Sequence, residues 1–62
     1  MSIGKKLLSL RQEKGISQEA LGPELNVSRQ TVSKWESDLS LPDMKMMITI
    51  SQFYEISITQ LL

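Results

Sequence analysis

Four polar residues at helical spacing are the side chains best suited to binding chemistry. They follow Ser28 in a segment whose apolar members, Val32 and Trp35, lie three residues apart and so share one helix face. An arginine can hold O6 and N7 of guanine with two hydrogen bonds, and a glutamine can hold N6 and N7 of adenine. The opposite face is therefore predicted to contact base edges in the DNA major groove, through Arg29, Gln30, Ser33 and Lys34.

Size and composition exclude most other kinds of chemistry. At 62 residues the chain forms one domain at most, so a site between two domains is excluded. It has no cysteine and no histidine, which removes thiolate metal sites, disulfides and the commonest general base. No paired carboxylates, activated nucleophile or glycine-rich phosphate loop is present. The sequence therefore predicts a protein that is not an enzyme, with no catalytic residue, metal site or cofactor.

The sequence also gives an expectation for the compartment. No apolar run is long enough to span a membrane, the start lacks the apolar core of a signal peptide, and the absence of cysteine suits a reducing cytoplasm. A cytoplasmic protein with no membrane partner is expected.

Net charge limits how strongly one copy would bind DNA. Seven basic residues balance seven acidic ones, and phosphate neutralisation supplies non-specific affinity. Six of the seven basic residues precede residue 35, so positive charge is concentrated in the first half. Of these, Lys5, Lys6 and Lys14 read more naturally as solvated side chains. A neutral domain is expected to bind as two copies, which places two recognition helices about 34 Å apart on a near-palindromic site.

Apolar periodicity and capping residues predict an all-α chain of five helices. An amphipathic helix is expected over residues 2–14, closed by Gly15, and a second one from the N-cap Ser17 to about residue 25. Ser28 caps the third, and Pro42-Asp43 marks the start of the fourth, whose apolar stripe is Met44, Met47, Ile50 and Tyr54. Ser57 is expected to cap a last short helix that ends at residues 61–62.

The second and third predicted helices form a helix-turn-helix over about residues 17–36. Ser28 and Thr31 carry hydroxyls that can donate to phosphate oxygens, and Gln18 begins a helix whose N-terminus suits a phosphate. Trp35 is expected in the core instead of acting as a stacking platform. On its own, the polar face of the third helix would more often be an ordinary solvated surface.

Taken together and in this order along the chain, these motifs resemble the Cro/C1-type helix-turn-helix family of bacterial and phage regulators. The similarity spans essentially the whole chain, and its most specific part is residues 27–36, Val-Ser-Arg-Gln-Thr-Val-Ser-Lys-Trp-Glu. The resemblance implies a five-helix, phage-repressor-like DNA-binding domain covering residues 1–62. It also implies a transcriptional regulator, predicted to be a repressor, that acts as a homodimer on double-stranded DNA.

The resemblance also implies roles for individual residues. It assigns base contacts to Arg29, Gln30 and Lys34 with Ser33 beside them, and a phosphate contact to Gln18, which would also brace the first recognition residue. It pairs Arg11 with Glu36 as an ion pair tying the first helix to the end of the recognition helix. Such a pair would position that helix more than it would stabilise the fold.

Two positions depart from the family pattern. Gly22 and Pro23 stand where the family has a small alanine and a helix-forming residue. Because proline removes a backbone donor and crowds the carbonyl four residues earlier, a kinked or tightened turn is predicted near residues 19–23. Glu55 stands where the family often has glycine or asparagine, so a left-handed backbone there would be mildly strained.

Apolar residues outside the expected core suggest a contact surface. By analogy with the family, the last helix is predicted to offer a dimer surface made of Ile58, Leu61 and Leu62. Leu8, Leu39 and Met46 fall where polar residues would be expected. They support an alternative function, a protein-binding module of the same fold whose partner is a toxin or an effector domain. A steep fall of DNA affinity with salt would separate the two functions.

Overall fold

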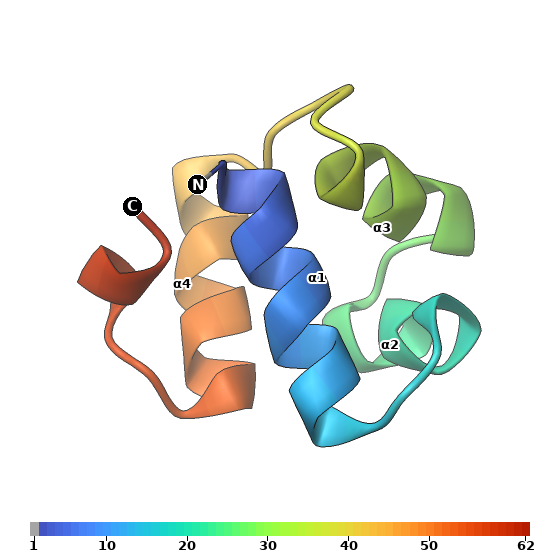
Figure 1. Ribbon diagram of the computed structural model, residues 1–62, viewed down its shortest axis with the longest axis horizontal. Helices are drawn as coiled ribbons and strands as arrows, with labels where there is room; N and C mark the ends of the chain where they lie inside the picture. The colour runs from blue at the N-terminus through green and yellow to red at the C-terminus, as the bar shows by residue number, and fades with distance from the viewer. Residues whose placement is uncertain (1) are drawn as a thin grey trace.

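The computed structural model describes residues 2–62, which fold into four α-helices and one short 3₁₀ helix (Figure 1). Among these residues there is no β-strand, and no helix is both long and apolar enough to cross a membrane. The elements are α1 (Ile3–Lys14), α2 (Gln18–Leu25), α3 (Arg29–Glu36), α4 (Met44–Tyr54) and η1 (Ile58–Gln60).

Local capping chemistry sets the ends of the helices. The Ser17 hydroxyl accepts a hydrogen bond from the Ala20 N–H at the start of α2, and the Ser28 hydroxyl accepts one from the Thr31 N–H at the start of α3. Gly15 closes α1 in the left-handed conformation, with a φ of 73°. The two predicted serine caps and the glycine stop are therefore confirmed.

The sequence predicted a kinked or tightened turn near residues 19–23, and the structure shows no break or 3₁₀ tightening there. Residues 18–25 form one uninterrupted α-helix that includes Pro23. The missing proline donor would have served the carbonyl of Glu19, which lies in the exposed first turn and can be hydrated. Gly22 has a different reason to be small, because a Cβ atom built there would lie 2.8 Å from the carbonyl oxygen of Val27. It lets the turn before α3 sit directly on α2.

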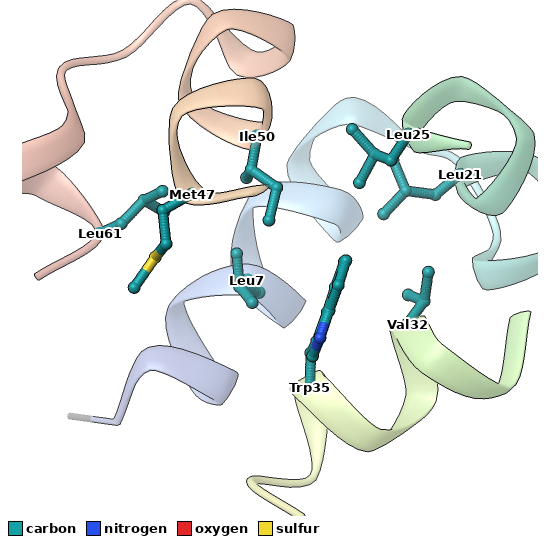
Figure 2. Close-up of a cluster of buried hydrophobic side chains, with 8 residues drawn as sticks. All are labelled: Leu7, Leu21, Leu25, Val32, Trp35, Met47, Ile50 and Leu61. Carbon is teal, nitrogen blue, oxygen red and sulfur yellow. The ribbon is translucent and has the colours of Figure 1, made fainter. Parts of the chain in front are cut away.

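The core lies between all four helices and the C-terminal segment (Figure 2). α3 packs against α1 and α2, and α2 also contacts α4. Trp35 reaches from α3 toward side chains of α1 and α4, so the predicted inward position of this residue is confirmed. The buried apolar residues are Leu7, Leu21, Leu25, Val32, Trp35, Met47, Ile50 and Leu61.

The fifth predicted element is a single 3₁₀ turn instead of a helix reaching residue 62. Its first residue is preceded by Ser57, whose backbone N–H donates to the side-chain oxygen of Gln60 at 2.9 Å. Leu61 follows this turn, has no exposed surface and lies beside Met47 in the core. Leu61 therefore cannot belong to a dimer surface, and its assignment to one is wrong.

The apolar stripe of α4 is rotated from its predicted position. Met47 and Ile50 are buried as expected, but Met44 is 58% exposed while Met46 is half-buried against the core. The face turned inward includes Ser51, which satisfies its hydroxyl by donating to the carbonyl of Ile48 at 2.8 Å. A polar residue whose hydroxyl is hydrogen-bonded within its own helix can occupy the core, and the buried face of α4 therefore includes Ser51 and not Met44.

Candidate nucleic-acid interface

α3 separates an apolar face from a polar face, as its sequence predicts. Val32 and Trp35 are turned into the core, which fixes the helix on the body of the domain. The side chains of Arg29, Gln30 and Lys34 are exposed, and that of Ser33 is partly exposed. The helix therefore presents a guanidinium, an amide and an ammonium group to solvent on a rigid support.

Ser28 and Thr31 share one hydroxyl hydrogen bond at the start of α3. Their side-chain oxygens lie 2.9 Å apart, and the Ser28 oxygen also accepts from the Thr31 N–H. One hydroxyl proton is used between the two side chains, so one remains to donate to a phosphate oxygen. The pair can thus provide one such contact, whereas the sequence assigned one to each residue.

Gln18 is tied to the far end of the recognition helix. Its amide N–H donates to the Glu36 carboxylate at 3.0 Å, and no hydrogen bond joins it to Arg29. In the structure Gln18 therefore contacts Glu36, the last residue of α3, whereas the resemblance implied a contact with Arg29, the first recognition residue. The second amide N–H of Gln18 remains for a phosphate contact.

Arg11 and Glu36 form a two-pronged ion pair between α1 and the end of α3. The Arg11 Nε and a terminal nitrogen donate to the two Glu36 carboxylate oxygens at 2.7 and 3.0 Å. The other terminal nitrogen donates to the Ile16 carbonyl at 2.8 Å. The side chains are only 14% and 5% exposed, and the hydrogen bond to Glu36 is the main cause that raises the pKa of Arg11. Arg11 therefore stays charged.

Tyr54 lies close enough to this pair to share its electrostatics. Removal from water is the main cause that raises the pKa of Tyr54 to about 12; the Glu36 carboxylate adds to this increase and Arg11 opposes it. The buried hydroxyl has no hydrogen-bond partner within residues 2–62. The sequence placed this tyrosine in the core, and no pattern in it signalled a neighbouring ion pair from two other helices.

Two lysines of α1 are engaged away from the recognition helix. Lys14 places its ammonium 5.0 Å from the ring centroid of Phe53, which is a cation–π distance. The Lys6 ammonium donates to the carbonyl oxygen of Leu62 at 3.1 Å. The exposed positive charge on the recognition helix itself comes from Arg29 and Lys34.

The described part of the chain offers no cluster of side chains for a metal site. Within residues 2–62, no group of three or more cysteine, histidine, aspartate or glutamate residues could hold a metal ion. The arrangement instead provides hydrogen-bond donors on a supported helix, which suits recognition of an extended polar surface.

An exposed polar second helix, seated on a short first helix through a tight turn, defines the class of helix-turn-helix regulators. A helix-turn-helix family model matches residues 7–61, so the chain belongs to that family, in its Cro/C1-type branch. This is a class of DNA-binding regulators and not of enzymes.

Two curated bacterial proteins match the whole chain. The HTH-type transcriptional activator BcrR of Enterococcus faecalis is 42% identical over 62 residues, which cover 30% of its length. The HTH-type transcriptional regulator ImmR of Bacillus subtilis (strain 168) is 34% identical over 62 residues, or 49% of its length. The chain thus spans less than half the length of these relatives.

Two crystal structures share the fold. The P22 c2 repressor, in complex with a synthetic operator, has a TM-score of 0.93 and 27% identity over 100% of this chain and 94% of its own. The restriction-modification controller protein C.AhdI from Aeromonas hydrophila has a TM-score of 0.86 and 25% identity, over 97% of this chain and 87% of its own.

Proposed function

We propose that this chain is a sequence-specific, double-stranded DNA-binding domain, residues 1–62, of a transcriptional regulator. The observation that carries the proposal is α3, which exposes Arg29, Gln30 and Lys34 while Val32 and Trp35 fix it to the core. The fold it shares with a repressor that is bound to operator DNA supports the same function.

The proposed recognition places the N-terminal half of α3 in the major groove. Arg29 would hold a guanine and Gln30 an adenine, each through two hydrogen bonds, with Lys34 and Ser33 beside them. Gln18 and the Ser28–Thr31 pair would donate to flanking phosphates and set the register of the helix on the duplex.

A homodimer on a near-palindromic operator is part of the proposal. One neutral copy neutralises few phosphates, so two linked copies are needed for useful affinity. Since Leu61 is in the core, the contact is assigned to the exposed apolar side chains of Met44, Ile48 and Leu62, with the half-buried Ile58 at its margin. Asp43 and Lys45 flank Met44 with opposite charges, so two copies related by a twofold axis can pair them reciprocally.

Occupancy of the operator is the step that repressors and activators share. The relatives include a protein named an activator and a structure named a repressor. Repression remains the prediction for this chain, since a bound dimer blocks polymerase wherever the operator overlaps a promoter. The site of action is the cytoplasm, where bacterial and phage DNA lies.

Site selection from random duplexes, followed by titration of variants, tests the proposal. Arg29→Ala and Gln30→Ala should each weaken binding to the selected operator by about fivefold to 150-fold, the equivalent of roughly 1–3 kcal/mol per bidentate base contact. Lys5→Ala, on an exposed position of α1, and Gln52→Ala, on an exposed position of α4, are matched controls and should leave affinity within about twofold. Equal affinity of all four variants would refute the assignment of α3.

The alternative, a protein-binding module, has one observation in its favour. Leu39 is 77% exposed in the loop between α3 and α4, although Leu8 and Met46 from the same predicted patch are half-buried. Salt separates the two functions, because DNA affinity should fall by about 0.9 logarithmic units per logarithmic unit of salt for each phosphate contacted. A flat salt dependence would favour the protein-binding function.

A further inference from the structure

The backbone turns sharply where the recognition helix ends, at a residue that is not glycine. Asp38 adopts a φ of 62°, in the left-handed region where side chains are strained. The turn is closed by backbone hydrogen bonds from Asp38 N–H to the Trp35 carbonyl and from Leu39 N–H to the Lys34 carbonyl. Glycine would adopt this turn without strain, so the aspartate is expected to have a function in its side chain.

That side chain reaches the beginning of α1. An Asp38 carboxylate oxygen accepts a hydrogen bond from the Gly4 N–H at 3.0 Å, across 34 positions of sequence. Gly4 lies in the first turn of α1, where backbone donors have no partner within the helix and negative charge is favourable. Asp38 thus lies in the turn that follows α3 and gives the first turn of α1 a hydrogen-bond acceptor in addition to its N-cap, Ser2.

The two helices approach more closely here than any other residue at position 4 would permit. A Cβ atom at Gly4 would lie 2.5 Å from the Trp35 carbonyl oxygen and 2.6 Å from an Asp38 carboxylate oxygen. The first turn of α1 is therefore in direct contact with the last turn of α3, and Gly4 is buried there.

The recognition helix is consequently held at two points along α1. One is Gly4, bonded to Asp38, and the other is Arg11, paired with Glu36. Seven residues of helix separate them, a span of about 10 Å at 1.5 Å per residue. The core contacts of Val32 and Trp35 hold α3 on the domain, and two fixed points at its end further restrict its tilt.

We propose that Asp38 is a positioning residue for DNA recognition, which sets the angle at which α3 enters the major groove through its bond to Gly4. This proposal rests on the proposed DNA-binding function. Asp38 lies about nine helical residues, or some 13 Å, from Arg29, so it acts through helix orientation and does not touch the bases. A tilt of about 10° at the anchored end would move Arg29 by roughly 2 Å, which is enough to break hydrogen bonds of 2.7–3.2 Å.

A loss of angle should affect base contacts more than phosphate contacts. Bidentate pairing to a base requires a fixed geometry, whereas long flexible side chains can still reach phosphates after a small tilt. The expected signature of losing Asp38 is therefore a lower ratio of operator affinity to random-duplex affinity, with random-duplex affinity unchanged.

The test compares three variants of the full chain at one salt concentration, each titrated against the selected operator and a random duplex. D38G removes the carboxylate and also relieves the left-handed strain, and should lower the affinity ratio at least tenfold. D38N keeps an oxygen that can accept from Gly4 N–H and should stay within about threefold of wild type. E55G is the matched control, because Glu55 has a φ of 56° and an exposed side chain at the end of α4. It should leave the ratio unchanged.

Each outcome decides the proposal. The fluorescence of Trp35 reports whether each variant is folded under the binding conditions. A folded D38G with a ratio within twofold of wild type would overturn the proposal, and so would a D38G chain that fails to fold, since the contact would then hold the domain together instead of orienting one helix. If wild type itself showed no preference for any duplex, the proposed function would fail instead.

Discussion

Replacing Glu36 by glutamine should destabilise the domain by about 3 kcal/mol. The substitution keeps the size and shape of the side chain and removes its charge, so Arg11 remains almost buried with the Ile16 carbonyl as its main partner. Breaking a buried ion pair by removing one partner costs about 3–5 kcal/mol, and the 14% exposure of Arg11 favours the lower end. Since stability scales at about 0.05–0.15 kcal/mol per residue, this is a large part of the roughly 3–9 kcal/mol expected for such a domain.

Urea unfolding followed by the fluorescence of Trp35, the single tryptophan, measures this loss. With a slope near the lower limit for small proteins, about 1 kcal/mol per molar urea, the midpoint should fall by roughly 3 M. Glu24→Gln makes the same chemical change on an exposed position of α2 and should stay within about 0.5 kcal/mol of wild type.

A second comparison separates the cost of an orphaned charge from the value of the pair. The double variant Arg11→Met with Glu36→Leu leaves no buried charge and should recover most of the stability lost by Glu36→Gln. A loss below about 1 kcal/mol for Glu36→Gln, as for an exposed surface pair, would refute the reasoning that the pair is desolvated.

Two further outcomes follow from the apolar surface and from Tyr54. Ile48→Lys should shift the chain from dimer to monomer in sedimentation velocity. Gln12→Lys, on an exposed part of α1, should leave the dimer intact. Equal sedimentation of the two variants would show that Ile48 does not belong to the interface. The pKa of Tyr54 is about 12 in the folded state and near 10 in the unfolded state. Between pH 10 and pH 12 only the unfolded state loses the proton, so the free energy of unfolding should fall as the pH rises through this range. Because Tyr54 is the single tyrosine, tyrosinate absorbance gives its pKa directly, and Tyr54→Phe should lose less stability than wild type over this range; a titration midpoint near 10 would contradict the burial of the hydroxyl.

The helix ends could be predicted from the sequence because their causes are local. A serine cap needs only a hydroxyl and a free backbone N–H three residues on, and both lie in one stretch of sequence. Ser17 and Ser28 therefore marked α2 and α3 correctly, and the left-handed stop at Gly15 followed in the same way. The polar face of α3 was predictable from spacing alone for the same reason.

Features that depend on tertiary contacts were not predictable. Pro23 was expected to distort α2, but the carbonyl it leaves without a donor belongs to an exposed residue of the first turn, which a sequence does not show. The buried face of α4 was mispredicted because it includes Ser51, and a polar residue is not counted as part of an apolar stripe. Leu61 was assigned to the surface, but it is fully buried and lies beside Met47 in the core.

For the recognition helix too, the local features could be predicted and the tertiary contacts could not. Its exposed side chains followed from its sequence, whereas the contacts at its far end join residues that are 18 to 34 positions apart. The family resemblance implied the Arg11–Glu36 pair, but Asp38 carries no local signal beyond tolerance of a turn, and Tyr54 is indistinguishable from any other stripe residue. Long-range contacts of this kind have to be observed.

The hydrogen bond between Lys6 and the carbonyl of Leu62 has a practical consequence for attaching further polypeptide. It holds the carboxyl end beside α1 and α4, on the opposite side of Figure 1 from α3. A fluorescent reporter or an affinity tag fused after residue 62 would thus emerge away from the duplex and leave the groove-facing helix unobstructed. A fusion at this end also starts from Leu62, which is assigned to the proposed dimer surface, so a bulky tag would compete with self-association before it interfered with operator recognition.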